Sequence, residues 1–172
     1  MRALPLAILG LCLGLGCSPA PSQSAWVRAN GGLAGQTHLA KAQAAFALLG
    51  AEKQSIHVSV INSDTAGAYA WPGGDVFVTR GLVDLLDEQE LAAALAHEMG
   101  HLIADHTANP PSSLHGVSTG NAAEISADAI GIQLLQKQGI NRDVMISMLR
   151  KVRGCNPTCR NAIQERIDIL SR

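Results

Sequence analysis

His97-Glu98-Met99-Gly100-His101 is the stretch that says most about the architecture of this 172-residue chain. On an α-helix, residues four apart lie on one face, so both imidazoles of the stretch can reach a single metal ion. Glu98 lies at the flank of that face, where its carboxylate can take a proton from a water that the metal activates. If the stretch is helical, it predicts a zinc site and a general base within about one turn.

The residues before this stretch predict the helix that the chemistry requires. Asp87 and Glu90 have the spacing of a capping box, in which each side chain bonds a backbone N–H at the start of a helix. An uninterrupted apolar pattern follows from Leu91 to Ile103. The paired histidines are therefore expected in the middle of a well-started helix.

The rest of the chain places strands before helices, which predicts an α+β fold. Alternating apolar residues predict a strand over 56–61, and Pro72-Gly73-Gly74 predicts the turn of a β-hairpin over 68–79. Helical spacing and capping residues predict helices over 37–49, 122–138, 142–153 and 160–170. A polar loop is expected over 107–120.

A catalytic zinc site needs a third protein ligand and a position left open for water. In the spacing HExxHxxGxxH the third histidine would fall at position 107, but Thr107 stands there and His106 misses it by one residue. His115 in the loop is a second candidate. Glu124 is the third, because Asp128 follows one turn later on the same helix face and can hold the free N–H of a ligating imidazole.

Three segments carry a resemblance to a known family: the paired histidines, the run Glu124-Ile125-Ser126-Ala127-Asp128-Ala129-Ile130-Gly131, and Pro-Gly-Gly-x-x-Phe-Val-x-x-Gly-Leu within 68–86. From about residue 56 to 170 they resemble the M48 family of zinc metalloendopeptidases. The resemblance implies a zincin-like metalloprotease domain, with a small β-hairpin or sheet packed on the HExxH helix and on a following helix that carries a glutamate ligand. The periplasmic lipoprotein members look closer than the multi-spanning ones, because no apolar run after residue 16 reaches membrane-spanning length.

The resemblance also implies a role for each matching residue. His97, His101 and Glu124 are expected to hold one Zn²⁺ per chain, with Glu98 as the general base. Asp128 is expected to accept a hydrogen bond from His97 and so fix the orientation of its ring.

The same resemblance places Ala70-Trp71-Pro72-Gly73-Gly74 in the wall of the substrate cleft. The backbone of Tyr69, Ala70 and Trp71 is then expected to pair with an extended protein or peptide substrate as an added strand.

One departure from the family concerns the oxyanion. Members commonly carry a His-Pro pair followed by Arg-Ile, whereas this chain has Asn156-Pro157 and then Arg166-Ile167. If the family's histidine stabilises the oxyanion, Asn156 and Arg166 are the candidates for that task here, and Tyr69 is a further candidate donor.

The N-terminus predicts export. A basic start and an apolar run indicate a signal peptide over 1–16, which is too short to span a bilayer. Cys17 and its small neighbours resemble a bacterial lipoprotein acylation site, although Gly14 replaces the usual leucine, and cleavage after Ala20 or Ala25 is the alternative. A tether rich in Pro, Ser and Gly is expected over 17–35 and the metallopeptidase domain over 36–172. These features predict a periplasmic protein anchored to the outer membrane through a lipid on Cys17.

Two cysteines remain in the folded part of the chain. In an oxidising compartment, the spacing of Cys155 and Cys159 around a turn predicts a disulfide. A thiolate metal site is the alternative, but two cysteines without nearby histidines leave zinc half-coordinated. A net charge of −1 and the lack of a basic run argue against a nucleic-acid partner.

Taken together, these features predict a zinc-dependent endopeptidase that hydrolyses peptide bonds in unfolded or misfolded envelope proteins. The alternative is a periplasmic chaperone or assembly factor that keeps the zinc fold without cutting. Asn156 and the small size of the chain favour this alternative. Glu98 argues against it, because a purely structural zinc site has no need of a carboxylate that does not bind the metal.

Overall fold

The computed structural model describes residues 22–50, 55–105, 107, 121–155 and 159–172. Within these ranges the chain forms seven helices and three strands, which confirms the α+β class. In chain order they are α1 (Gln23–Ala29), α2 (Gln36–Ala47), β1 (His57–Ile61), β2 (Ala68–Trp71), β3 (Asp75–Thr79), α3 (Arg80–Leu85), α4 (Glu88–Ile103), α5 (Asn121–Lys137), α6 (Asp143–Cys155) and α7 (Arg160–Leu170).

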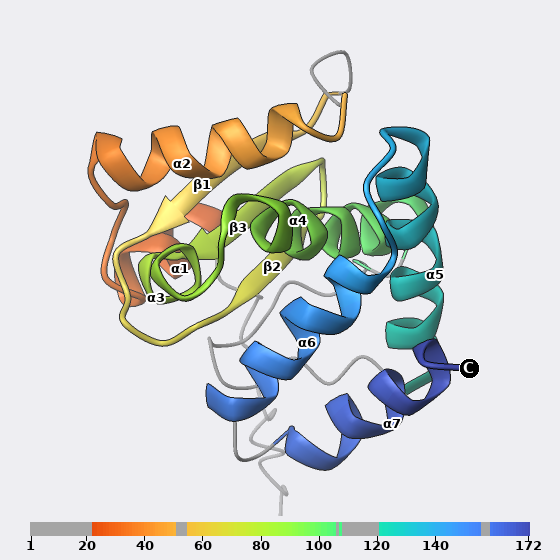
Figure 1. The fold of residues 1–172 in the computed structure, drawn as a ribbon. Coiled ribbons are helices and arrows are strands. Elements are labelled where there is room, and N and C mark those ends of the chain that lie inside the picture. The colour runs from red at the N-terminus through yellow and green to blue at the C-terminus, as the bar shows by residue number, and fades with distance from the viewer. Residues whose placement is uncertain (1–21, 51–54, 106, 108–120, 156–158) are drawn as a thin grey trace, which may run out of the picture.

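Helix α4 carries the paired histidines and is the most enclosed element. In Figure 1 it crosses the middle of the molecule, with α2 above it and α6 below. The predicted capping box is formed: the Glu90 N–H donates to the Asp87 side chain at 2.9 Å, and the Asp87 N–H donates to the Glu90 side chain at 3.0 Å. Every residue from Glu90 to His101 is buried, so the histidines sit on a helix held from several sides.

The sheet has the strand order β1-β3-β2. Strands β2 and β3 form the predicted hairpin, with Ala68 opposite Val78 and Trp71 opposite Asp75. Strand β1 pairs with β3 in parallel, which the sequence did not predict. Gly74 turns the hairpin at a φ of +101°, where a side chain would also meet the Ser55 carbonyl oxygen at 2.5 Å. Strand β2 therefore ends at a turn whose backbone conformation is closely constrained.

The two faces of the sheet pack against different groups. One face joins the main core with α2 and α4 through residues that include Val60, Val76 and Val78. The opposite face carries Tyr69 and Trp71 of β2, which pack with three further residues in a second cluster.

The second cluster includes a helix where a tether was expected. Trp26 of α1 is only 2% exposed and packs against the sheet. The described residues 22–35 thus belong in large part to the folded unit, in contrast to the tether predicted over 17–35. Composition misled here because a single tryptophan can bury enough apolar area to anchor a short helix. The predicted signal peptide and Cys17 lie outside the described residues.

The remaining helices lie close to their predicted ranges, except α3, which the sequence did not reveal. Thr79 caps α3 by accepting from the Leu82 N–H at 3.2 Å. Asn141 accepts from the Asp143 N–H at 2.9 Å and caps α6 as predicted. Among the described helices, none combines the length and apolar character needed to cross a bilayer.

Candidate metal centre

Two glycines bring α5 against α4. A Cβ on Gly100 would lie 2.5 Å from the carbonyl oxygen of Ala127, and one on Gly131 would lie 3.1 Å from the backbone of Ala96. Both positions therefore need glycine for the two helix backbones to come this close. The close approach carries the first turn of α5, with Glu124, to the histidines of α4.

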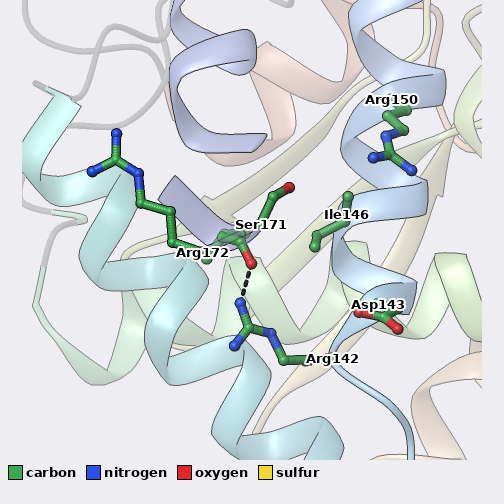
Figure 2. A pocket seen from close by; sticks show the side chains of 7 residues that line it. Arg142, Asp143, Ile146, Arg150, Ser171 and Arg172 are labelled. Carbon is green, nitrogen blue, oxygen red and sulfur yellow. Dashed lines mark hydrogen bonds between the residues drawn. The ribbon is translucent and has the colours of Figure 1, made fainter. Parts of the chain in front are cut away.

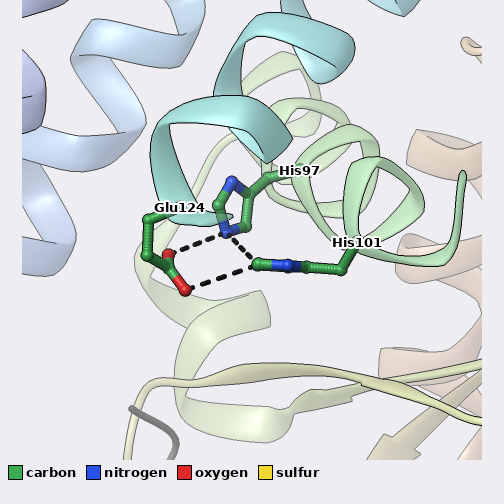
Figure 3. Close-up of side chains that lie close together, drawn as sticks. All are labelled: His97, His101 and Glu124. Carbon is green, nitrogen blue, oxygen red and sulfur yellow. Dashed lines mark hydrogen bonds and ion pairs between the residues drawn. The ribbon is translucent and has the colours of Figure 1, made fainter. Parts of the chain in front are cut away.

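His97, His101 and Glu124 converge on one point, as Figure 3 shows. The Nε2 atoms of the two histidines lie 3.1 Å apart, and the Glu124 carboxylate oxygens lie 3.3 Å from Nε2 of His97 and 3.5 Å from Nε2 of His101. A tetrahedral zinc ion with ligand bonds of 2.0–2.1 Å separates neighbouring ligand atoms by about 3.3–3.4 Å. The distance to His97 is from Oε2 of Glu124 and the distance to His101 is from Oε1, so each neighbouring pair of donor atoms lies near this separation. Two imidazoles and a carboxylate also suit zinc by their chemistry.

Asp128 and Arg166 support these ligands from behind. Asp128 Oδ1 lies 2.8 Å from Nδ1 of His97, the partner that the family resemblance implied for it. Arg166 donates to both oxygens of Asp128, at 2.7 and 2.6 Å, and to Glu124 at 2.9 Å. Arg166 is 8% exposed, and the Glu124 oxygen that it contacts, Oε2, is the one 3.3 Å from Nε2 of His97. These contacts suit the orientation of the ligands, and the oxyanion role of Arg166 stays a prediction.

The charges of this group shift one another's protonation. Burial lowers the pKa of His97, but hydrogen bonds with Asp128 and Glu124 outweigh it and raise that pKa to about 9. Burial raises the pKa of Glu124, yet the two histidines hold it well below its usual range. Burial likewise opposes ionisation of Asp128, and the bonds from Arg166 and His97 lower its pKa. The hydrogen bonds with the two carboxylates therefore favour the protonated form of His97.

Glu98 lies beside this group and touches the sheet. It is 7% exposed, and burial raises its pKa, although the two histidines and a hydrogen bond from the Ala70 N–H oppose the shift. A carboxylate with a raised pKa is suited to accept and return a proton near neutral pH.

The backbone hydrogen bonds of β2 show which of its residues face β3 and which face the outer edge of the sheet. Thr79 N–H donates to the Gly67 carbonyl and Gly74 N–H to the Trp71 carbonyl, so the odd-numbered residues 67 and 71 face β3. By the alternation of an antiparallel pair, the backbone groups of Ala68 and Ala70 face the outer edge. That edge lies next to Glu98.

The other predicted residues are placed as follows. The Tyr69 and Trp71 side chains are each 7% exposed and turn to the second cluster, so these two residues can offer a substrate little beyond backbone. Burial and the charge of Glu98 raise the pKa of Tyr69 well above its usual range. Gly73 and Gly74 form the hairpin turn. Outside the described residues lie Asn156, His106 and His115.

No disulfide joins Cys155 to Cys159 in the structure. Cys155 is the exposed last residue of α6, and Cys159 immediately precedes α7.

A separate cavity of about 530 Å³ lies away from the His–Glu group, between α6 and the end of α7 (Figure 2). Three arginines, Arg142, Arg150 and Arg172, contribute to its lining, and Ile146 and Leu170 form its apolar part. Arg142 donates a hydrogen bond to the carbonyl of Leu170. The cavity contains none of the candidate metal ligands.

The fold is consistent in general terms with a zincin-like metallopeptidase domain, and the site combines an HExxH helix, a glutamate from the next helix and an edge strand beside them. The sequence model of peptidase family M48 matches residues 36–120. This match covers 85 of the 172 residues and, together with the metalloproteases named below, supports an M48 metalloendopeptidase.

Several characterised proteins share parts of the sequence. The β-barrel assembly-enhancing protease of Yersinia pestis is 28% identical over 56% of this chain and 28% of its own length. The metalloprotease LoiP of Escherichia coli is 29% identical over 49% of this chain and 34% of its own length. A protease HtpX homolog of Aeropyrum pernix is 47% identical over 31% of this chain and 17% of its own length. The chain thus spans about a third or less of these relatives.

Proposed function

We propose that this chain is a zinc-dependent endopeptidase that cuts extended segments of unfolded or misfolded envelope proteins. The observation that carries the proposal is the convergence of three side chains: the histidine Nε2 atoms lie 3.1 Å apart, and the two oxygens of Glu124 lie 3.3 and 3.5 Å from them, close to the edge length of a zinc tetrahedron. In this proposal His97, His101 and Glu124 hold one zinc ion.

Bound there, zinc would lower the pKa of a water toward about 7 and polarise the scissile carbonyl. Glu98, buried and one residue from a ligand, takes the proton of the attacking water and delivers it to the leaving amine. Asp128 and Arg166 hold His97 and Glu124 in place while this happens.

The outer edge of β2 is the proposed substrate strand. In the described residues β2 pairs only with β3, and the backbone groups of Ala68 and Ala70 face outward beside Glu98. An extended peptide added there would bring its scissile bond past the catalytic carboxylate. Because recognition is by backbone, the preferred substrates are unfolded chains.

The proposed setting is the periplasm, with Cys17 as a lipid anchor in the outer membrane. The predicted export signal supports this setting, and so do the matches to the β-barrel assembly-enhancing proteases of Yersinia pestis and Escherichia coli.

The test is incubation of purified protein with unfolded casein, with and without a zinc chelator, beside a Glu98→Gln variant. We expect chelator-sensitive cleavage by the wild type, and a variant that binds zinc fully but does not cut. If the wild type suppresses casein aggregation without producing fragments, the chaperone alternative holds. Cleavage by a zinc-loaded Glu98→Gln variant would remove Glu98 from its assigned role.

A further inference from the structure

The helix α1 lies against the sheet on the face opposite to α4. Its Trp26 is surrounded by aromatic rings, with ring centroids 5.5 Å from Tyr69, 5.4 Å from Trp71 and 5.5 Å from Phe77. Trp26 is 2% exposed, and the rings meet edge-on or tilted, as buried aromatic pairs prefer. We call this group, completed by Ile61, the outer-face cluster.

Polar bonds fix α1 and the segment after it to the other two strands. Gln23 Nε2 donates to Asp75 of β3 at 2.8 Å. The Ala34 N–H donates to the Val60 carbonyl of β1 at 2.8 Å, and the Asn62 N–H donates to the Gly32 carbonyl at 2.9 Å. Residues 23–34 are thus fastened at both ends, and Trp26 is pressed onto β2 and β3 between these points.

Strand β2 connects this packing to Glu98. It is four residues long, it is an edge strand, and two of its side chains, Tyr69 and Trp71, belong to the outer-face cluster. Between these two residues, Ala70 donates its N–H to Glu98. A shift of the two aromatic side chains must therefore move the backbone that meets the catalytic carboxylate.

We propose that Trp26 is a positioning residue of the peptidase site, which acts through Tyr69 and Trp71 to hold strand β2 in register with Glu98 and with a bound peptide. The proposal rests on the proposed function, because it concerns the same substrate strand. The family model matches residues 36–120, so helix α1, which carries Trp26, lies outside the matched part of the chain.

The test compares three variants with the wild type. Trp26→Ala removes the ring, and Trp26→Phe keeps a ring while removing a buried indole N–H that has no acceptor among the described residues. Phe46→Ala is the control, because Phe46 packs against the main core and not against the outer-face cluster. Amide hydrogen exchange compares β2 with α4, and zinc content, kcat and KM are measured with a fluorogenic casein-derived peptide.

For Trp26→Ala we expect full zinc content, amide exchange at 68–71 faster by tenfold or more with α4 unchanged, and a KM raised about tenfold. Trp26→Phe should restore most of the KM, and Phe46→Ala should lower the melting temperature without changing KM or β2 exchange. If Trp26→Ala does not fold, Gln23→Ala, which frees α1 from Asp75, should produce the same pattern more weakly.

Two results for Trp26→Ala would show that Trp26 only stabilises the fold. The first is amide exchange at 68–71 that rises no more than exchange in α4. The second is a KM within twofold of the wild-type value while kcat falls. If the wild type cuts no peptide, the proposed function fails, and the exchange pattern alone decides whether Trp26 fixes β2.

Discussion

The sharpest prediction concerns Gly100, which touches no metal and lies between the two histidines. In Gly100→Ala the new methyl group would sit 2.5 Å from the Ala127 carbonyl oxygen, whereas a carbon–oxygen contact needs about 3.3 Å. Helix α5 must therefore retreat by roughly 0.8 Å. Glu124 lies three residues from Ala127 on the same helix and retreats with it.

That retreat exceeds the tolerance of a zinc site, where ligand distances vary by about 0.2 Å. We expect the zinc affinity of Gly100→Ala to fall at least about tenfold, the lower end of what outer-shell changes cost. The crowding should cost about 1–3 kcal/mol of stability, offset by up to about 1 kcal/mol from the better helix propensity of alanine. The protein should therefore stay folded while its metal site weakens.

The assay is competition for zinc against a chromophoric chelator, with circular dichroism to verify the fold. Gly154→Ala is the matched control, since Gly154 is helical in α6 and a Cβ there meets nothing within 4 Å. It should bind zinc as the wild type does. A folded Gly100→Ala protein with zinc affinity within twofold of the wild type would refute the claim that this glycine sets the position of Glu124.

Three further outcomes test the surroundings of the site. Asp128→Asn should weaken zinc binding by about 10–100-fold and lower the melting temperature, because the amide is neutral and keeps one acceptor oxygen where His97 and Arg166 use two; a zinc titration unchanged from the wild type would contradict this. Zinc binding at pH 7.5 should release about one proton, because the pKa of His97 in the metal-free site is about 9 and the ligand must be neutral; calorimetry in buffers of different ionisation enthalpy measures it, and a count near zero would be inconsistent with a protonated His97. Burial works against the charge of Glu90, but hydrogen bonds with Lys151, Asp87 and Ser147 lower the pKa of Glu90 in the folded protein. The ionised carboxylate therefore stabilises the fold above its unfolded-state pKa, near 4.3, and this stabilisation is lost as the pH falls through the folded-state pKa. Glu90→Gln should therefore cost about 1–2 kcal/mol in urea unfolding at pH 7 and much less near pH 2, and an equal cost at both would count against the ionised Glu90.

Local chemistry made the core of the site predictable. The capping box of Asp87 and Glu90 fixes where α4 begins, and the four-residue spacing then fixes that His97 and His101 share a face. The position of Asp128 one turn after Glu124 predicted a contact with one of the ligating imidazoles, and the family resemblance indicated that this imidazole is His97. Apart from that assignment to His97, each of these predictions depends only on the spacing of residues along one helix.

Long-range relations were not predictable in the same way. The parallel pairing of β1 with β3 depends on where the chain returns, which the alternation of side chains does not encode. Arg166 is 38 residues from Asp128, and its sequence position did not indicate that its donors would be taken by carboxylates. Trp26 looked like part of a tether because its neighbours are small and polar, and only the packed sheet reveals its partners. Gly100 and Gly131 could have signalled the close helix contact, since glycine within a helix costs stability unless packing requires it.

The early start of α1 limits how far the catalytic domain can work from its proposed anchor. Four residues lie between Cys17 and Ser22, the N-cap of α1, and the five steps from one to the other span at most about 18 Å. A tether that ended at residue 35 would have reached roughly 65 Å. With a lipid on Cys17, the domain would be confined to the membrane surface. It would then meet chains that stall while they enter or leave the bilayer and miss those that unfold deeper in the periplasm.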